Sequence, residues 1–308
     1  MHKLKELIVE LSANCNLACS MCGYGRQPYS ASKFMKNELY TLILDKFGSI
    51  SDNIRLNGRG ESTLHPDFVS MLKYTKDRFP GININLFTNL CFNNNILLDS
   101  LITSNVQLFI SIDSPNNEEL HKIRVKSSYT LITRNLGYLK KTKKRPFLVF
   151  TLQPANTHRI KDIAKFAAQY DLGIIYNTVR FDRGMDNVTE FFQNKKDQII
   201  ADFHAVSDLY KNKKSLIHMP QSITGIFINP SHTQTYGQAE KCPAILNELC
   251  VLYNGDITPC NMFNPYIYAN VNKLDGRSID DLESFKTFQK NKDADPYCKN
   301  CACIGGTS

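Results

Sequence analysis

The chain of 308 residues is 42% hydrophobic and 21% charged, which is ordinary for a globular protein with a substantial core. Its 37 Lys and Arg exceed its 29 Asp and Glu, which gives a net charge of +8. No stretch approaches ~18 uninterrupted apolar residues and no aromatic residues alternate with the basic runs, so the composition excludes a membrane span and argues against nucleic-acid binding.

Ten cysteines stand in a sequence whose N-terminus shows no long apolar run after its basic residues. We therefore expect no signal peptide, a reducing cytoplasmic setting, and metal ligation in place of disulfides. Basic residues gather at 140–145 and 211–214, at the ends of expected helices. These runs form either a solvated surface or a feature that attracts an anionic substrate or an acidic electron donor.

Strand and helix patterns alternate from the N-terminus to about residue 180. Strands are expected at residues 7–11, 53–57, 82–88, 107–112, 147–153 and 173–180. Helices are expected between them at residues 37–47, 68–78, 95–104, 129–140 and 160–170. This rhythm predicts a parallel sheet with right-handed crossovers, and six strands fall short of the eight of a closed barrel. The expected fold class is therefore α/β, an open partial (β/α)6 barrel with its chemistry at the carboxyl ends of the strands.

Three cysteines follow the first expected strand on one short loop with the spacing C-x3-C-x2-C, namely Cys15, Cys19 and Cys22. Three thiolates on one loop can hold an iron–sulfur cluster and leave its fourth iron without a protein ligand, open to a small molecule. Zinc is the alternative, although zinc favours four ligands in C-x2-C pairs. The spacing after a first strand resembles the radical S-adenosylmethionine (SAM) superfamily, whose fold is the same partial barrel.

That resemblance implies a [4Fe–4S] cluster on Cys15, Cys19 and Cys22 that binds SAM at its open iron, with Met21 in the cofactor site. It also implies a flavodoxin- or ferredoxin-like electron donor and cleavage of SAM to a 5′-deoxyadenosyl radical, which removes a hydrogen atom from a small-molecule substrate. The cofactor supplies this reactivity, while the protein positions the C–H bond and excludes water.

The ends of the second and third strands resemble SAM-contacting motifs of the superfamily. Residues 57–62 (NGRGES) resemble its Gly-Gly-Glu motif, which lines the SAM amino group, but Arg59 stands where the second glycine is usual. Residues 88–89 resemble its Thr-Asn-Gly strand end. The residues that the resemblance implies as SAM contacts here are Gly58, Gly60, Glu61, Thr88 and Asn89.

The fourth and fifth strand ends carry further candidates for cofactor binding. Ser111 and Asp113 stand where the superfamily faces the SAM ribose, although Asp113 is equally placed to cap the next helix. Arg124 resembles an arginine that often binds the SAM carboxylate, and the alternative is a surface arginine. Gln153 ends the fifth strand as a SAM or substrate contact.

A second set of cysteines follows a segment in which the β/α rhythm breaks. We expect a barrel at 1–184, an irregular and helical insertion or linker at 185–240 that is a candidate for substrate binding, and a cluster domain at 241–308. The cluster domain is expected to contain an Asn-Gly hairpin around Gly255 and a helix at 279–290. The cysteines expected to hold an auxiliary cluster are Cys242, Cys260, Cys298 and Cys301.

The spacing from Cys242 through Gly255 to Cys260 resembles the front of the SPASM motif. Because the later cysteines of the full motif are missing, the segment resembles its shortened relative, the twitch domain, with one auxiliary [4Fe–4S] cluster. A zinc site on the same cysteines is the alternative. The 17-residue gap between Cys242 and Cys260 and the C-K-N-C ending also resemble radical SAM dehydrogenases of aminoglycoside biosynthesis. In these an arginine is thought to contact the substrate hydroxyl, which implies this role for Arg183.

The resemblance implies oxidation of a hydroxylated sugar or cyclitol, with the auxiliary cluster accepting an electron from the substrate radical. An epimerase in which a thiol returns a hydrogen atom is the first alternative, with Cys250 as the candidate donor. Cys91 and Cys303 are then either buried inert thiols or further candidates. Maturation of a ribosomal peptide is another alternative, and a zinc-binding adaptor is the alternative outside enzymes.

Overall fold

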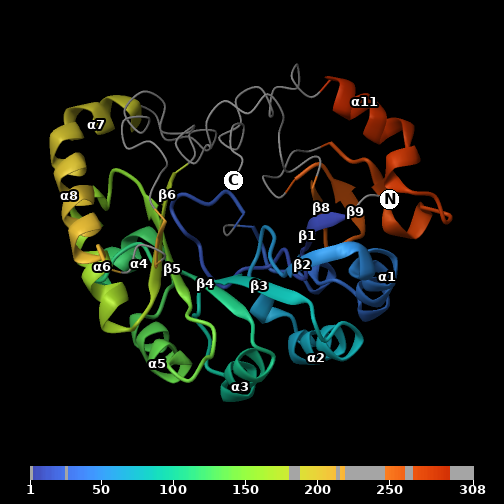
Figure 1. Cartoon of the computed structure of the whole chain (residues 1–308), viewed down its shortest axis with the longest axis horizontal. Helices are drawn as coiled ribbons and strands as arrows, with labels where there is room; N and C mark the ends of the chain where they lie inside the picture. The colour runs from blue at the N-terminus through green and yellow to red at the C-terminus, as the bar shows by residue number, and fades with distance from the viewer. Residues whose placement is uncertain are drawn as a thin grey trace.

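A curved, mostly parallel sheet with helices along its outer face makes up this computed structural model (Figure 1). The structure describes residues 3–24, 27–179, 188–212, 216–218, 247–260 and 266–291. Five residues with expected roles lie outside the described residues: Arg183, Cys242, Cys298, Cys301 and Cys303. Their roles stay predictions.

The strands of the described residues form one ten-stranded sheet in the order β10-β9-β8-β1-β2-β3-β4-β5-β6-β7. The barrel strands are β1 (Leu4–Val9), β2 (Ser51–Arg55), β3 (Asn83–Thr88), β4 (Gln107–Ser111), β5 (Phe147–Leu152) and β6 (Gly173–Thr178). The others are β7 (Ile217–His218), β8 (Glu248–Val251), β9 (Asp256–Thr258) and β10 (Ala269–Asn270). Strands β1 to β7 pair in parallel, as helical crossovers require.

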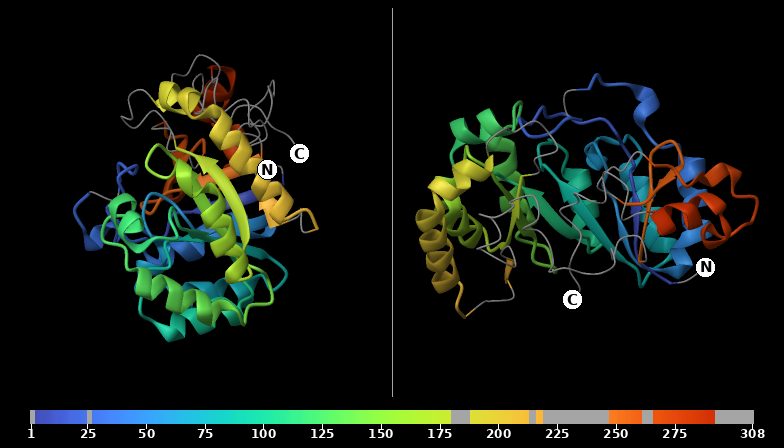
Figure 2. Two further views of the ribbon diagram at one scale, coloured as in Figure 1. Left: turned by 90° about the vertical axis from the view of Figure 1, so that its left-hand side faces the viewer. Right: turned by 90° about the horizontal axis from the view of Figure 1, so that it is seen from above.

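The helices follow the strands in sequence, and most of them, from α1 to α8 with the exception of α4 and α7, lie along the outside of the sheet (Figures 1 and 2). They are α1 (Asn37–Phe47), α2 (Phe68–Arg78), α3 (Asn95–Thr103), α4 (Asn117–Ile123), α5 (Tyr129–Leu139), α6 (Ile160–Gln169), α7 (Val188–Asn194), α8 (Lys196–Leu209) and α11 (Glu283–Asn291). The expected partial barrel is therefore confirmed, and its strand and helix ends shift by only a few residues. Among the described residues, no helix combines the length and apolar character that a membrane crossing requires.

Helix α4 was not expected from the sequence. It has seven residues, too few to show a helical apolar period, and it begins where the Asn116 side chain accepts a hydrogen bond from the backbone N–H of Glu119. The described part of the expected irregular and helical segment at 185–240 contains two helices, α7 and α8. A short helix between β4 and α5 therefore places Arg124, its C-terminal cap residue, beside the barrel opening.

A row of aromatic rings crosses the inner face of the sheet from β3 to β5. The Phe87 and Phe109 rings stack at 4.5 Å between centroids, and the Phe109 and Phe147 rings stack at 6.0 Å. Next to this row, Gly173 of β6 has no side chain, and a Cβ there would lie 2.4 Å from Cε1 of Phe147. Glycine at the start of β6 therefore provides the space that the last ring of the row occupies.

The expected hairpin is confirmed, and it joins the barrel sheet directly. Strands β8 and β9 are antiparallel and connect through Asn254-Gly255, where Gly255 has φ +89°. Strand β8 also pairs in parallel with β1, with Ile8 opposite Cys250. Backbone hydrogen bonds therefore cross between the expected barrel and the expected cluster domain.

We predict that Gly173→Ala destabilises the protein by about 1–3 kcal/mol, because the new methyl group forces the Phe147 ring out of its stack. The matched control is Gly137→Ala in α5, where nothing lies within 4 Å of the added Cβ. We expect the free energy of unfolding of this control to rise by about 0.5–1 kcal/mol, because Ala has a higher helix propensity than Gly. Thermal unfolding of anaerobically purified protein measures both, and a Gly173→Ala variant as stable as the wild type would contradict the packing argument.

Candidate iron–sulfur and SAM site

The loop that carries Cys15, Cys19 and Cys22 leaves the carboxyl end of β1 and is tied down at two places. The Asn14 side chain exchanges two hydrogen bonds with the backbone of Ser30, both at 2.9 Å. Further along the loop, the N–H of Ala18 donates to Val125 O at 2.9 Å and that of Ser20 donates to Ile123 O at 2.8 Å. The loop is therefore fixed to the segment before α1 and to the end of α4.

The three thiols of this loop fit an iron–sulfur cluster. Burial raises the pKa of the Cys15 thiol to about 12 and also raises the pKa of Cys19, and the charges of neighbouring sulfurs add to both increases. Among the residues that the structure describes, no three Cys, His, Asp or Glu side chains gather around a position for one metal ion. A cuboidal cluster instead binds each thiolate through a different iron atom. Three thiols on one loop that is hydrogen-bonded to its neighbours match that requirement.

Glu61 brings the ends of β2 and β3 together. Its Oε1 accepts hydrogen bonds from Thr63 and, at 2.9 Å, from the hydroxyl of Thr88. Its Oε2 accepts from the backbone N–H of Asn89 at 2.7 Å. Burial raises the pKa of Glu61, while these hydrogen bonds stabilise its carboxylate. The structure thus unites three residues that the sequence singled out separately, and their direct contact with SAM stays a prediction.

The two glycines of this motif allow close approach of the neighbouring chain. A Cβ at Gly60 would lie 2.2 Å from the carbonyl oxygen of Asn14 and 2.6 Å from that of Ser12. The N–H of Glu61 donates to the same Asn14 oxygen at 2.7 Å. A Cβ at Gly58 would lie 2.3 Å from the Glu10 side chain. The motif loop therefore packs against the cysteine loop with no room for a side chain at either glycine.

Asp113 and Arg124 form a buried ion pair with 2.7 Å between Oδ2 and Nε. The other Asp113 oxygen accepts from the N–H of Thr151 at 2.7 Å, which anchors the carboxylate between β4 and β5. Arg124 Nη1 lies 4.0 Å from Cys19 Sγ, and the arginine charge lowers the pKa that burial raises at this thiol. Arg124 therefore places a positive charge beside a candidate cluster ligand. Its expected contact with the SAM carboxylate stays a prediction, as does the contact of Asp113 with the ribose.

Two buried side-chain amide atoms at the same edge of the sheet have no hydrogen-bonding partner among the described residues. They are Nε2 of Gln153, a residue that is 1% exposed, and Oδ1 of Asn57. Because buried polar atoms are almost always paired, these atoms indicate a place for a polar ligand. Ser111 and Met21, the other expected cofactor residues here, are half-buried. The residues present therefore fit a polar cofactor such as SAM.

Cys250 and Cys260, which both belong to the hairpin segment, differ in their exposure to solvent. Cys250 is 1% exposed, interacts with Thr258, and has a pKa that burial raises to about 12. Cys260 follows β9 and is half-buried. Cys91 is also buried, and its sulfur accepts a hydrogen bond from Ser128 N at 3.1 Å. Of these three thiols, Cys260 is therefore the most accessible to a metal cluster.

Sequence reasoning missed Glu10, the last side chain before the cysteine loop. It is fully buried and pairs with Arg59 at 2.6 Å. Two signals were available in the sequence. Glu10 is the charged residue of the otherwise apolar strand expected at residues 7–11, and Arg59 stands where the motif usually has a glycine.

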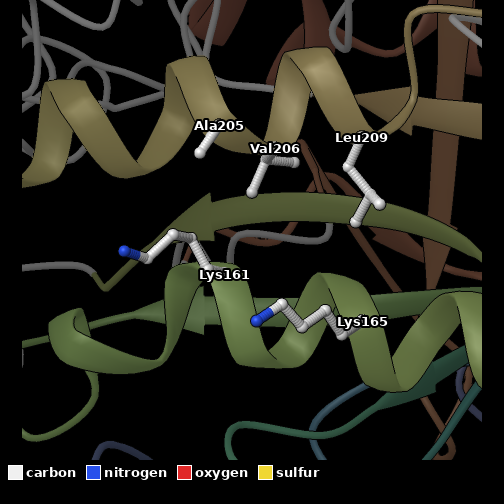
Figure 3. Close-up of a pocket in the computed structure, with 5 residues that line it drawn as sticks. All are labelled: Lys161, Lys165, Ala205, Val206 and Leu209. Carbon is white, nitrogen blue, oxygen red and sulfur yellow. The ribbon is translucent and has the colours of Figure 1, made fainter.

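The pocket in Figure 3 lies elsewhere, between α6 and α8 of the outer helical layer. Its volume is about 290 Å³, and it is lined by Lys161, Lys165, Ala205, Val206 and Leu209. Lys161 is paired with Asp202 at 3.0 Å. The pocket lies in the outer helical layer, whereas the candidate site lies at the carboxyl ends of the strands. It is therefore no part of the candidate site.

Comparison with protein families agrees with this geometry. The model of the radical SAM superfamily matches residues 9–167, which is more than half of the chain. The chain belongs to the radical SAM superfamily. The model of the SPASM family, an iron-sulfur cluster-binding domain, matches residues 242–302. The protein is therefore a radical SAM enzyme with a SPASM domain, and its cofactors are SAM and [4Fe–4S] clusters, as the sequence predicted.

A curated relative is 32% identical over 112 residues: the tungsten-containing aldehyde ferredoxin oxidoreductase cofactor-modifying protein of Pyrococcus furiosus. The match covers 35% of this chain and 29% of the relative, so the chain spans less than a third of that protein.

Solved structures share the fold over nearly the whole chain. Native anSMEcpe with bound AdoMet and Cp18Cys peptide has a TM-score of 0.72 at 17% identity, covering 98% of this chain and 88% of that one. SuiB of Streptococcus suis bound to S-adenosylmethionine has a TM-score of 0.70 at 15% identity, covering 99% and 73%. BtrN in complex with AdoMet and 2-DOIA has a TM-score of 0.53 at 15% identity, covering 98% and 94%.

We predict that Gly60→Ala weakens SAM binding by about 5- to 150-fold, the equivalent of about 1–3 kcal/mol of overpacking. The added methyl group displaces the motif loop from the backbone of Ser12 and Asn14. Gly81→Ala is the matched control, because nothing lies within 4 Å of its added Cβ. Equilibrium binding of SAM to anaerobically prepared protein gives both dissociation constants. Equal affinities for the two variants would show that the close approach at Gly60 is unimportant.

Proposed function

We propose that this enzyme carries out a two-electron oxidation of its substrate, with the auxiliary cluster as electron acceptor. The pairing of β8 with β1 is the observation that supports this reaction. Strand β1 leads into the loop of Cys15, Cys19 and Cys22, and β8 begins the hairpin that ends at Cys260. The two proposed ligand sets therefore belong to one continuous sheet, since the first follows β1, Cys260 follows β9, and β8 pairs with both strands. Such a connection supports a fixed path for electron transfer between the two clusters.

The residues of the chain prepare the site for this chemistry. When bound, SAM and its cluster supply the radical chemistry that removes a hydrogen atom from an unactivated C–H bond. Arg124, fixed by Asp113, places positive charge beside Cys19. Hydrogen bonds and positive charge near a cluster sulfur are among the factors that set its reduction potential. Gln153 Nε2 and Asn57 Oδ1 offer a buried donor and a buried acceptor to the cofactor or the substrate.

A hydroxylated sugar or cyclitol is the substrate class that we propose first, held by Arg183 at its reacting hydroxyl group. The support is the sequence around Arg183 and the spacing of Cys242 and Cys260, together with the fold shared with the BtrN complex. A flavodoxin- or ferredoxin-like protein in the cytoplasm is the electron donor in this proposal. The net positive charge of +8 suits an acidic donor.

A peptide is the second candidate substrate, and the strength of the structural matches favours it. The anSMEcpe structure with bound Cp18Cys peptide has a TM-score of 0.72, and SuiB bound to its precursor peptide SuiA has one of 0.67. The complex of BtrN with 2-DOIA has a TM-score of 0.53. The same radical chemistry would then act on a side chain or backbone carbon of the peptide.

Epimerisation through Cys250 has less support than oxidation. The Cys250 thiol is 1% exposed and interacts with Thr258, so it has no open path to a substrate in the described part of the chain. An epimerase needs a thiol that can approach the substrate radical and return a hydrogen atom to it.

We predict that anaerobically purified enzyme contains about eight iron atoms per chain, and that Cys19→Ala retains about four. The reason is that Cys19 is a proposed ligand of one of two clusters. Cys91→Ala is the matched control, because Cys91 is also a buried thiol but bonds to Ser128 N. Iron and sulfide analysis measures the content. Zinc at about one or two atoms per chain in place of iron would favour the adaptor alternative and overturn the cluster assignment.

We predict that reaction with dithionite, SAM and metabolites from cells grown in deuterated medium transfers deuterium into 5′-deoxyadenosine. The product should have lost two hydrogen atoms relative to the substrate, because oxidation leaves no hydrogen to return. Cys250→Ala should turn over at the wild-type rate. With unlabelled metabolites in deuterated water, a product isomeric with the substrate that has gained one solvent deuterium, together with loss of turnover in Cys250→Ala, would establish epimerisation instead. Parallel reactions with peptide fractions show whether the substrate is a peptide or a hydroxylated sugar or cyclitol.

A further inference from the structure

The carboxylate of Glu10 accepts hydrogen bonds from two parts of the chain that are far apart in sequence. Glu10 is 0% exposed and follows β1 directly. Its Oε1 accepts from the backbone N–H and from Nε of Arg59 at 2.7 and 2.8 Å. Its Oε2 accepts from Nη2 of Arg59 at 2.6 Å and from the backbone N–H of Tyr253 at 3.3 Å. The SAM-motif loop and the hairpin of the SPASM domain are thus bonded to one buried carboxylate.

The guanidinium of Arg59 also lies near two tyrosine rings from different segments. Its central carbon is 5.9 Å from the ring centroid of Tyr24, two residues past the last cysteine of the cluster loop. It is 5.7 Å from the ring centroid of Tyr253, in the turn between β8 and β9. Cation–π attraction at these distances favours a guanidinium, which is planar and can stack while its edge binds the carboxylate.

The glycines on either side explain why this loop can carry an arginine. Gly58 leaves space for the Glu10 side chain, and Gly60 leaves space for the backbone of the cysteine loop. Between these glycines, Arg59 directs its side chain to Glu10, and its own backbone N–H binds the same oxygen as its Nε. The position of the motif loop and the position of the hairpin are therefore set by the same ion pair.

We propose that Arg59, held by Glu10, is a positioning residue that couples the SAM-binding loop to the hairpin of the auxiliary-cluster domain. SAM binding at the motif loop then reduces the motion of the hairpin, and the hairpin in turn supports SAM binding. Such coupling is reciprocal, so both effects depend on the same contacts. This inference concerns communication between the two sites and holds whether the reaction is an oxidation or an epimerisation.

Hydrogen exchange of the cluster-loaded enzyme, measured with and without SAM and with no reductant present, tests the coupling. In the wild type, SAM should slow amide exchange in residues 248–258 by about 5-fold or more. Arg59→Gln should abolish this difference and weaken SAM binding by a similar factor. Arg59→Lys should restore part of both, since it keeps the charge but cannot bind Glu10 through two parallel hydrogen bonds.

The matched control is Arg55→Gln, because Arg55 of β2 forms an ion pair with Glu6 of β1 and lies over the Phe87 ring at 5.6 Å. It should keep the SAM-dependent protection of the hairpin. If Arg59→Gln does not fold because Glu10 is left buried without its partner, the double variant Glu10→Gln with Arg59→Gln replaces it. Hairpin protection that persists without the Arg59 charge, or that Arg55→Gln removes equally, would overturn the proposal. Cleavage of SAM by the variants is recorded separately, so a wrong substrate assignment does not affect this result.

Discussion

Strand β1 has hydrogen-bonded neighbours on both edges, and this double pairing is the constraint on which the rest of the structure depends. On one side β2 carries the SAM motif, and on the other β8 carries the hairpin of the SPASM domain. The second half of the strand is apolar and buried, with Leu7, Ile8 and Val9 at 0% exposure. Any movement of β1 would move the cysteine loop relative to both neighbours, so the geometry of the whole site rests on this one strand.

Buried carboxylates fix the loops that follow the carboxyl ends of the strands next to β1 and further along the sheet. Glu10, Glu61 and Asp113 are all nearly or fully buried, and each accepts hydrogen bonds or an ion pair from a neighbouring segment. Breaking a buried ion pair by removal of one partner costs about 3–5 kcal/mol in proteins, because the remaining charge stays buried. These groups therefore hold loops of irregular conformation in one arrangement. A site that must position a reactive cofactor and exclude water needs this rigidity.

The inner and outer faces of the sheet are covered by different groups. The outer face is covered by helices, and the pocket between α6 and α8 belongs to this layer. The inner face carries the aromatic row of Phe87, Phe109 and Phe147. At its carboxyl edge lie polar atoms of Gln153 and Asn57 that have no hydrogen-bonding partner in the described part of the chain. The polar groups available to a ligand are thus at one edge of the sheet, which is also where the cysteine loop leaves β1.

Local patterns in the sequence predicted the six barrel strands, the longer helices between them and the hairpin, because apolar periodicity and the Asn254-Gly255 turn act over short stretches of chain. The seven residues of α4 were too few to show such a pattern. The spacing of Cys15, Cys19 and Cys22 likewise identified the cluster loop and, through it, the superfamily. The tertiary structure alone decided the partners of the charged residues. Glu61 bonds to Thr88 and Asn89, Asp113 pairs with Arg124, and Glu10 pairs with Arg59. These contacts join side chains from different strand ends, whose proximity depends on the register and curvature of the sheet, and no local pattern in the sequence encodes either.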